Sequence, residues 1–384
     1  MRDLLLGRSV KDVDLVLAEG GARRSLSEAA RFASVLARAT GGRLKRHDRF
    51  GTATVSLPGG DSIDVAVERQ ESYEHPGALP DVAPARSIEE DLRRRDFTIH
   101  AMALEIAPGR AARLVDPLGG RRDLARKRLA ILHPRSFEDD PTRAFRLARY
   151  ANRLRMTVDA RTREALACAV KGMFFDRVSG QRIQRELELL LSEPGREGAL
   201  RWIRRLGLAE TLLPALKITP RALAGARELE RTSHGRRNSP GWFAFLLVWA
   251  CDLSPVQARS LADRLALSGA QAASLRRWPS VLERLREKNS LSPSSVAKLK
   301  LTHDEKAAAK AMLMGPSRRQ FARAVRREGI TLGIHGGDLL GAGLLPGPDI
   351  GRALERTLAA RRDERISKAQ ELKFALSVAA ESRR

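Results

Sequence analysis

The sequence predicts an α+β protein in which a small head of strands and helices is followed by a long helical remainder. Strand-like and helical segments alternate up to about residue 115, whereas later segments show almost only helical periodicity. A turn-rich joint at 116–124 separates the two regions. The chain of 384 residues is long enough for several domains. We expect a head at 1–115, a helical neck at 116–195, a helical body at 196–290 and a helical tail at 291–384.

The composition indicates a cytoplasmic protein that binds a polyanion. The 70 Lys and Arg residues exceed the 46 Asp and Glu residues and give a formal net charge of +24. Such a surface attracts polyanions, above all nucleic acid, although an arginine-rich codon usage is the alternative explanation. The two cysteines, Cys168 and Cys251, lie far apart in apolar helical settings and predict neither a disulfide framework nor a zinc site. We see no signal peptide and no apolar run of membrane-spanning length, so no membrane is expected.

The first strand is predicted at 10–17, where β-branched and apolar residues surround two carboxylates. A period of two places Asp12 and Asp14 on one face of this strand. Adjacent carboxylates repel each other, and a shared divalent cation relieves that repulsion. The pair therefore indicates a metal site. The alternative is a solvated strand edge with two ordinary acids.

A helix and a hairpin follow the first strand. The capping-box pattern at 25–28 predicts a helix that runs to about Thr40. Two strands at 52–57 and 62–68 are joined by a turn of Pro, Gly and Asp residues. If this hairpin lies beside the first strand in one antiparallel sheet, Asp64 supplies a third carboxylate. Without a metal or a basic partner, a core-facing Asp64 would be costly, which favours a functional role.

Two later strings carry the features of a nucleotide site. Three arginines at 93–95 run into a buried-looking segment, which suits binding of a polyphosphate. Further along, Asp140 is predicted as the N-cap of a helix with a proline at its first position. Asp140, Arg143 and Arg146 follow at three-residue steps and share a helix face. The alternative is a helix cap with an ordinary salt bridge.

In order and spacing, these strings resemble the motifs of the tRNA nucleotidyltransferases that build the 3′ CCA end. Bacterial poly(A) polymerases of the same class (class II of the polymerase-β-like nucleotidyltransferases) share them. The resemblance runs nearly from end to end, and its five ordered motifs are found at 2–14, 94–98, 116–120, 138–146 and 179–187. Segments 337–339 and 346–351 resemble the tail of the family.

The resemblance implies a polymerase-β-type head with an antiparallel sheet and helices, and an all-helical neck, body and tail. It also implies two Mg²⁺ ions held by the catalytic residues Asp12, Asp14 and Asp64. The residues expected to bind nucleotide are Arg8, Arg94, Arg95, Asp96, His100, Asp140, Arg143 and Arg146.

Particular roles follow for several of these residues. Asp96 is expected to accept from the ribose 2′-OH. Asp140 and Arg143 are expected to read the amino donor and ring-nitrogen acceptor that cytosine and adenine share. Arg182 and Glu186, four residues apart on one helix, are expected to form an internal ion pair that braces the pocket.

Two departures from the family pattern bear on activity. The family places a strand and a glycine pair before its first motif, whereas here Met1 directly precedes Arg2. We therefore expect the true start to lie upstream. His100 stands where the family usually has Asn.

Three functions stay open: addition of C and/or A to tRNA from CTP and ATP, poly(A) synthesis, and an RNA-binding relative that is catalytically impaired. The segment 70–87 looks full length, which disfavours a CC-only enzyme. The sequence does not distinguish CCA, CC and A addition further, and it does not give the oligomeric state.

Overall fold

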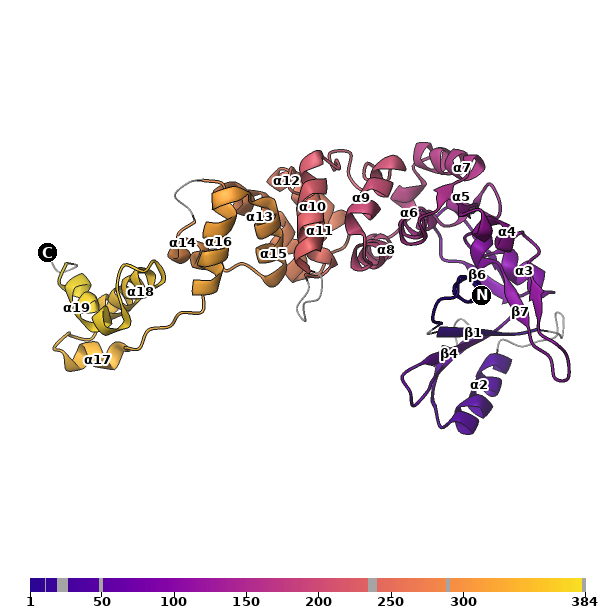
Figure 1. Cartoon of the computed structure of the whole chain (residues 1–384), viewed down its shortest axis with the longest axis horizontal. Helices are drawn as coiled ribbons and strands as arrows, with labels where there is room; N and C mark the ends of the chain where they lie inside the picture. The colour runs from indigo at the N-terminus through magenta and orange to yellow at the C-terminus, as the bar shows by residue number, and fades with distance from the viewer. Residues whose placement is uncertain (11, 19–26, 48–50, 234–239, 288–290, 382–384) are drawn as a thin grey trace. The chain divides into compact units, whose positions relative to one another are not determined.

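The computed structural model describes residues 1–10, 12–18, 27–47, 51–233, 240–287 and 291–381 (Figure 1). The chain forms two compact units. One comprises Met1–Glu186 with Arg205–Thr211, and the other comprises Leu187–Arg204 with Leu212–Arg384. The mixed head followed by helices agrees with the predicted α+β class. The fourfold division into head, neck, body and tail stays a prediction.

The head is built on a four-stranded sheet with the order β1-β4-β3-β2. Its strands are β1 (Asp12–Leu17), β2 (Arg43–His47), β3 (Thr52–Ser56) and β4 (Ser62–Val67). The predicted hairpin is confirmed as the antiparallel pair β3 and β4. Strand β2 was not predicted, because its five residues are mostly polar and exposed and give no apolar alternation.

The sheet is mixed, and the expectation of a purely antiparallel sheet is wrong at one pairing. Strand β1 runs parallel to β4, whereas β3 is antiparallel to both β2 and β4. Parallel neighbours require a long crossover connection. Here helix α2 (Ser27–Thr40) and two intervening strands provide it. Ser25 and Leu26 of the predicted capping box lie outside the described residues.

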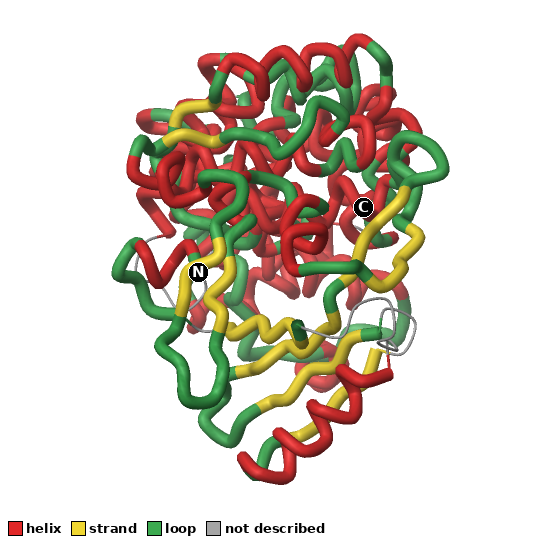
Figure 2. The backbone as a smooth tube through the Cα atoms, turned by 90° about the vertical axis from the view of Figure 1, so that its right-hand side faces the viewer, coloured by secondary structure: helices red, strands yellow, loops and turns green. Residues whose placement is uncertain are grey.

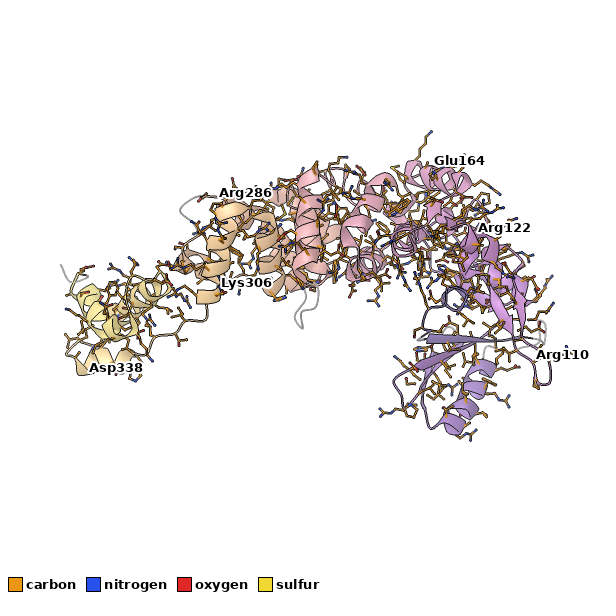
Figure 3. All side chains as sticks on the ribbon, in the orientation of Figure 1. Arg110, Arg122, Glu164, Arg286, Lys306 and Asp338 are labelled. Atoms are coloured by element: carbon orange, nitrogen blue, oxygen red, sulfur yellow. The ribbon has the colours of Figure 1, made fainter. Side chains whose placement is uncertain are left out.

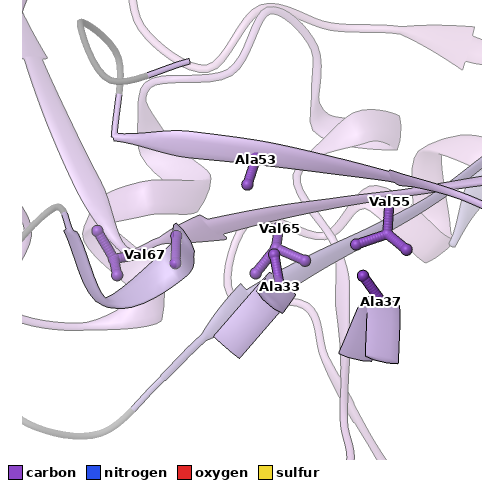
Figure 4. Close-up of a cluster of buried hydrophobic side chains, with 7 residues drawn as sticks. Ala33, Ala37, Ala53, Val55, Val65 and Val67 are labelled. Carbon is purple, nitrogen blue, oxygen red and sulfur yellow. The ribbon is translucent and has the colours of Figure 1, made fainter. Parts of the chain in front are cut away.

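One face of this sheet packs against α2. Ala29, Ala33 and Ala37 of the helix lie fully or almost fully buried on Val55 and Val65 of the strands (Figure 4). The small alanine side chains let the helix approach the sheet closely, while the valines fill the pleated surface. Because side chains alternate along a strand, the residues next to each of these valines on its own strand point to the opposite face. That face is polar and carries the candidate site.

The remainder of the first unit consists of short strands and helices (Figure 2). In chain order, beginning before the sheet, they are α1 (Arg2–Leu5), β5 (Arg69–Ser72), β6 (Asp81–Pro84), α3 (Ile88–Arg93), β7 (Ala103–Glu105), β8 (Arg113–Val115), α4 (Gly120–Ala125), β9 (Arg128–Leu129), α5 (Ser136–Asp139), α6 (Arg143–Leu154), β10 (Thr157–Val158) and α7 (Ala160–Lys171). Arg110 lies in the loop that joins β7 to β8 (Figure 3). Helix α6 begins at Arg143 with Thr142 as its N-cap position, two residues after the predicted cap, but Asp140 still accepts from the Thr142 backbone N–H as a capping side chain does.

The later chain is helical, as predicted. Its helices are α8 (Gly180–Ser192), α9 (Arg196–Arg205), α10 (Pro220–Ser233), α11 (Trp242–Trp249), α12 (Pro255–Arg264), α13 (Gly269–Arg284), α14 (Pro293–Lys298), α15 (His303–Met312), α16 (Gly315–Arg327), α17 (Gly336–Gly341), α18 (Pro348–Arg362) and α19 (Glu371–Glu381). Helix α11 is apolar on all sides and almost entirely buried. None of the described helices is both long enough and apolar enough to cross a bilayer.

Candidate active site

The polar face of the sheet opens into a cleft of about 2650 Å³ within the first unit. Strands β1, β3 and β4 contribute one part of its lining, and segments around α3 and α6 contribute another. Of the residues predicted from the sequence, the cleft is lined by Asp14, Asp64, Arg94, Arg95, Asp96, His100, Asp140, Arg143, Arg146 and Glu186. Residues from segments up to about 170 positions apart in the sequence therefore meet at one site.

Two of the three predicted metal-binding carboxylates lie side by side. Asp14 of β1 is the direct register partner of Asp64 of β4, so both side chains point to the cleft face, and both are exposed. This follows from the parallel register and does not need the antiparallel pairing that the sequence suggested. Thr54 of β3, opposite Asp64, donates a hydrogen bond to its Oδ1 at 2.6 Å. Asp12 lies two residues before Asp14 on β1, and its side chain is outside what the structure describes.

Exposed carboxylates are the ligands that Mg²⁺ takes, with water and phosphate oxygens in its remaining positions. Among the side chains that the structure describes, no group of three or more acids or histidines forms a complete metal cage. Asp14 and Asp64 thus fit an open site with two carboxylate ligands.

Asp96 anchors the opposite part of the cleft. Its carboxylate is buried and accepts four hydrogen bonds: from the Phe97 backbone and His100 Nδ1 at 2.8 and 2.6 Å on Oδ1, and from Arg146 Nε and Nη2 at 2.8 and 2.7 Å on Oδ2. Burial alone would raise the pKa of Asp96, but the His100 and Arg146 contacts outweigh it and hold that pKa well below its usual range. Because the usual acceptor positions of a carboxylate are all occupied, a ribose 2′-OH would have to displace one of these donors.

His100 links Asp96 to the first helix. Its Nε2 lies 2.6 Å from Nη1 of Arg2, and its Nδ1 contacts Asp96. Since a guanidinium can only donate, Nε2 accepts and Nδ1–H donates to Asp96. Burial lowers the pKa of His100 despite the neighbouring carboxylate. The ring was predicted to bind nucleotide, yet both of its nitrogens contact protein groups.

Tyr150, which the sequence did not single out, lies beneath this linkage. The guanidinium carbons of Arg2, Arg146 and Arg149 lie 5.3, 5.8 and 4.8 Å from the centre of its ring. Cation–π contacts of this kind hold arginines in place without neutralising them.

A neutral His100 predicts a pH dependence of stability. The unfolded ring takes up a proton as the pH falls through about 6.5, whereas the folded ring resists protonation. Stability should therefore decrease with falling pH in this range. In His100→Asn, which cannot titrate, this component should be absent. We expect a flatter curve of melting temperature against pH between pH 7.5 and 5.5 for the variant. Parallel curves for the two proteins would contradict this assignment.

Asp140 and Arg143 both line the cleft, and each is held by hydrogen bonds to other protein groups. Asp140 uses one oxygen, Oδ1, to accept from the backbone and hydroxyl of Thr142 at 3.0 and 2.7 Å and from Arg182 Nη2 at 2.9 Å. Arg143 is buried and donates to Ser136 Oγ at 2.9 Å and to the Arg94 carbonyl at 2.8 Å. Both side chains are therefore fixed in position before any ligand binds.

The predicted ion pair between Arg182 and Glu186 does not form. Arg182 instead bonds Asp140 and donates to the Gly77 carbonyl at 2.6 Å. Glu186 lies 3.5 Å from both Arg146 and Arg149. The two residues are four apart on one helix, but each contacts groups on other segments instead. Each contacts a different member of the site, and the bracing role itself stays a prediction.

The other predicted arginines differ in how many contacts they make with protein groups. Arg94 is held by Asp91 at 2.9 Å and Glu71 at 2.8 Å, which leaves little of its guanidinium free. Arg95 makes one longer contact to Asp91 at 3.3 Å, and its Nε is buried without a hydrogen-bond partner. Arg8 is exposed in the segment between α1 and β1.

Comparison with known proteins agrees with this geometry. Residues 1–130 match the family model described as the poly A polymerase head domain. The chain is 38% identical over 231 residues to the A-adding tRNA nucleotidyltransferase of Geobacter sulfurreducens, which covers 60% of this chain and 25% of that protein. It is 32% identical over 380 residues to the CC-adding tRNA nucleotidyltransferase of Deinococcus radiodurans, covering 98% of this chain and 86% of that protein.

Among solved structures, the chain resembles the Thermotoga maritima CCA-adding enzyme complexed with tRNA. The TM-score is 0.77 at 28% identity, with 99% of this chain and 89% of the other covered. The fold is that of a nucleotidyltransferase. On the relationship to the Deinococcus protein, the chain belongs to the family of tRNA nucleotidyltransferases.

Proposed function

We propose that this protein adds C and/or A to the 3′ end of tRNA, from CTP and ATP, without a nucleic-acid template. The observation that carries the proposal is the register pairing of Asp14 with Asp64 on the face of the sheet that opens into an arginine-lined cleft. The A-adding and CC-adding relatives support the choice of nucleotides. The net charge of +24 supports an RNA substrate. We place this activity in the cytoplasm.

Asp14 and Asp64 would hold Mg²⁺ together with Asp12. When bound, Mg²⁺ lowers the pKa of the attacking 3′-hydroxyl and neutralises charge on the leaving pyrophosphate. The chain's own residues supply position, because the Thr54 hydroxyl fixes one oxygen of Asp64, which lines the cleft. Arg95, the least committed arginine of its motif, is the group we assign to the phosphates.

Base selection is assigned to Asp140 and Arg143. The second carboxylate oxygen of Asp140 accepts no hydrogen bond from any described residue, so it can take the amino group of cytosine or adenine. The donors that Arg143 does not use in binding Ser136 and Arg94 can serve the ring nitrogen. Guanine and uracil present a keto oxygen and a ring N–H at these positions, so both protein groups would be mismatched at a cost of about 1–3 kcal/mol for each unpaired buried group.

Poly(A) synthesis is the second candidate, because the head matches a family model of that description. The experiment supplies the purified chain with Mg²⁺, each labelled nucleoside triphosphate in turn, and tRNAs that end before the first, second or third residue of CCA. We expect C and/or A to be incorporated, G and U to be excluded, and extension to stop at the CCA end.

Two outcomes would replace the proposal. Long A tails on many RNAs would assign poly(A) synthesis. RNA binding without any incorporation, unchanged in Asp14→Asn, would assign an RNA-binding protein that has lost catalysis.

A further inference from the structure

Two exposed cations of β2, Arg43 and Lys45, form a cationic strip on the same face of the sheet as Asp14 and Asp64. The strand pairings align Asp14, Asp64, Thr54 and Lys45 in one row across β1, β4, β3 and β2. Since strand side chains alternate, Arg43 and Lys45 point to the cleft face, and Leu44 and Arg46 point to the α2 face. A contact of 3.5 Å between His47 Nε2 and Thr54 Oγ1 agrees with this assignment of faces.

Arg43 and Lys45 are exposed and make no ion pair or hydrogen bond with any side chain that the structure describes. Two arginines of the cleft differ in this respect, because Arg94 and Arg146 are each held by a carboxylate. The positive charge at the sheet edge is therefore available to a ligand. With neighbouring strands about 4.8 Å apart, the Cα of Lys45 lies two strand spacings, or about 10 Å, from that of Asp64.

We propose that Arg43 and Lys45 bind the phosphodiester backbone of the RNA next to its 3′ end and so bring the terminal hydroxyl to Asp64. This inference rests on the proposed function. In an in-line displacement the attacking hydroxyl and the leaving pyrophosphate lie on opposite sides of the phosphorus. The strip lies beyond Asp64 and away from Asp14, on β2 at the edge of the sheet opposite to β1. A ligand that contacts both the cleft and this edge of the sheet must be long. A polynucleotide meets this requirement, whereas a single nucleotide does not.

An edge strand also carries charges simply to prevent pairing with other chains. That role does not depend on which face a charge occupies or on the length of a bound RNA. An experiment that varies both the face of the charge and the length of the RNA therefore distinguishes the two explanations.

The experiment measures equilibrium binding of two RNAs without nucleotide present. One is a tRNA that ends just before the CCA, and the other is the same tRNA shortened by three further 3′ nucleotides. The double variant Arg43→Gln/Lys45→Gln is compared with wild type and with Arg46→Gln, on the same strand but the opposite face. We expect wild type and Arg46→Gln to favour the longer RNA by about tenfold, the scale of one or two phosphate contacts, and the double variant to favour it by at most about twofold.

The salt dependence gives a second readout for the longer RNA. Loss of two phosphate contacts to a single strand should reduce the slope of log K against log[salt] by about 1.4. An unchanged preference and slope in the double variant would overturn the inference, even if the wild-type chain incorporates nucleotides normally. Absence of incorporation by wild type, with these differences in binding intact, would instead count against the proposed function alone.

Discussion

Asp64→Asn is expected to lower kcat by at least about a thousandfold while leaving the fold intact. The substitution keeps the shape of the side chain but removes a negative charge next to Asp14, the register partner of Asp64 on the neighbouring strand. Loss of a metal-binding carboxylate weakens charge stabilisation in the transition state by several kcal/mol, and about 4 kcal/mol corresponds to three orders of magnitude in rate. Because Asp64 is exposed, the free energy of unfolding should change little. Single-turnover incorporation and denaturant unfolding measure the two quantities.

Asp61→Asn is the matched control. Asp61 is exposed in the turn that joins β3 to β4, three residues before Asp64 on the same hairpin. The same change of charge there should leave kcat within about twofold of wild type, because surface charges beyond about 10 Å from the reacting atoms are largely screened at 0.1 M salt. If Asp64→Asn retained the wild-type rate, Asp64 would not belong to the catalytic centre.

Asp96→Asn is expected to cost about 3–5 kcal/mol of folding free energy, the scale for breaking a buried ion pair by removing one partner. The asparagine amide cannot accept on the atom that replaces one oxygen, so either Arg146 or His100 loses its partner. The half-buried guanidinium of Arg146 would then keep the Glu186 contact at 3.5 Å and its place over the Tyr150 ring. Urea-induced unfolding at pH 7 measures the loss, with Asp61→Asn again as the exposed control.

The same carboxylate predicts the sign of an acid effect. The folded-state pKa of Asp96 lies below its unfolded value, so its contribution to stability is present above about pH 4 and is lost as the pH falls further. The difference in unfolding free energy between wild type and Asp96→Asn should therefore shrink as the pH is lowered from 5 towards 3. A difference that stays constant over this range would show that the charge of Asp96 does not carry the stability.

The sequence predicted the features that depend on local periodicity and on ordered motifs. Alternation along β1 indicated that Asp12 and Asp14 share one face of their strand, whereas only the parallel register of β1 on β4 decided that Asp64 lies beside Asp14. The helical period predicted α2, and the turn residues predicted the β3–β4 hairpin. Each of these signals acts within about ten residues, where chain geometry alone decides which side chains share a face.

Only the tertiary structure decided the partners of the charged groups. Arg182 and Glu186 were in reach of each other along one helix, yet each contacts a group from another segment. Strand β2 carried no apolar pattern to predict it, and it is held by pairing with β3. The direction of β1 against β4 likewise depends on how the crossover packs. Charged side chains choose partners by distance and burial in three dimensions, and the order of residues along the chain does not contain those distances.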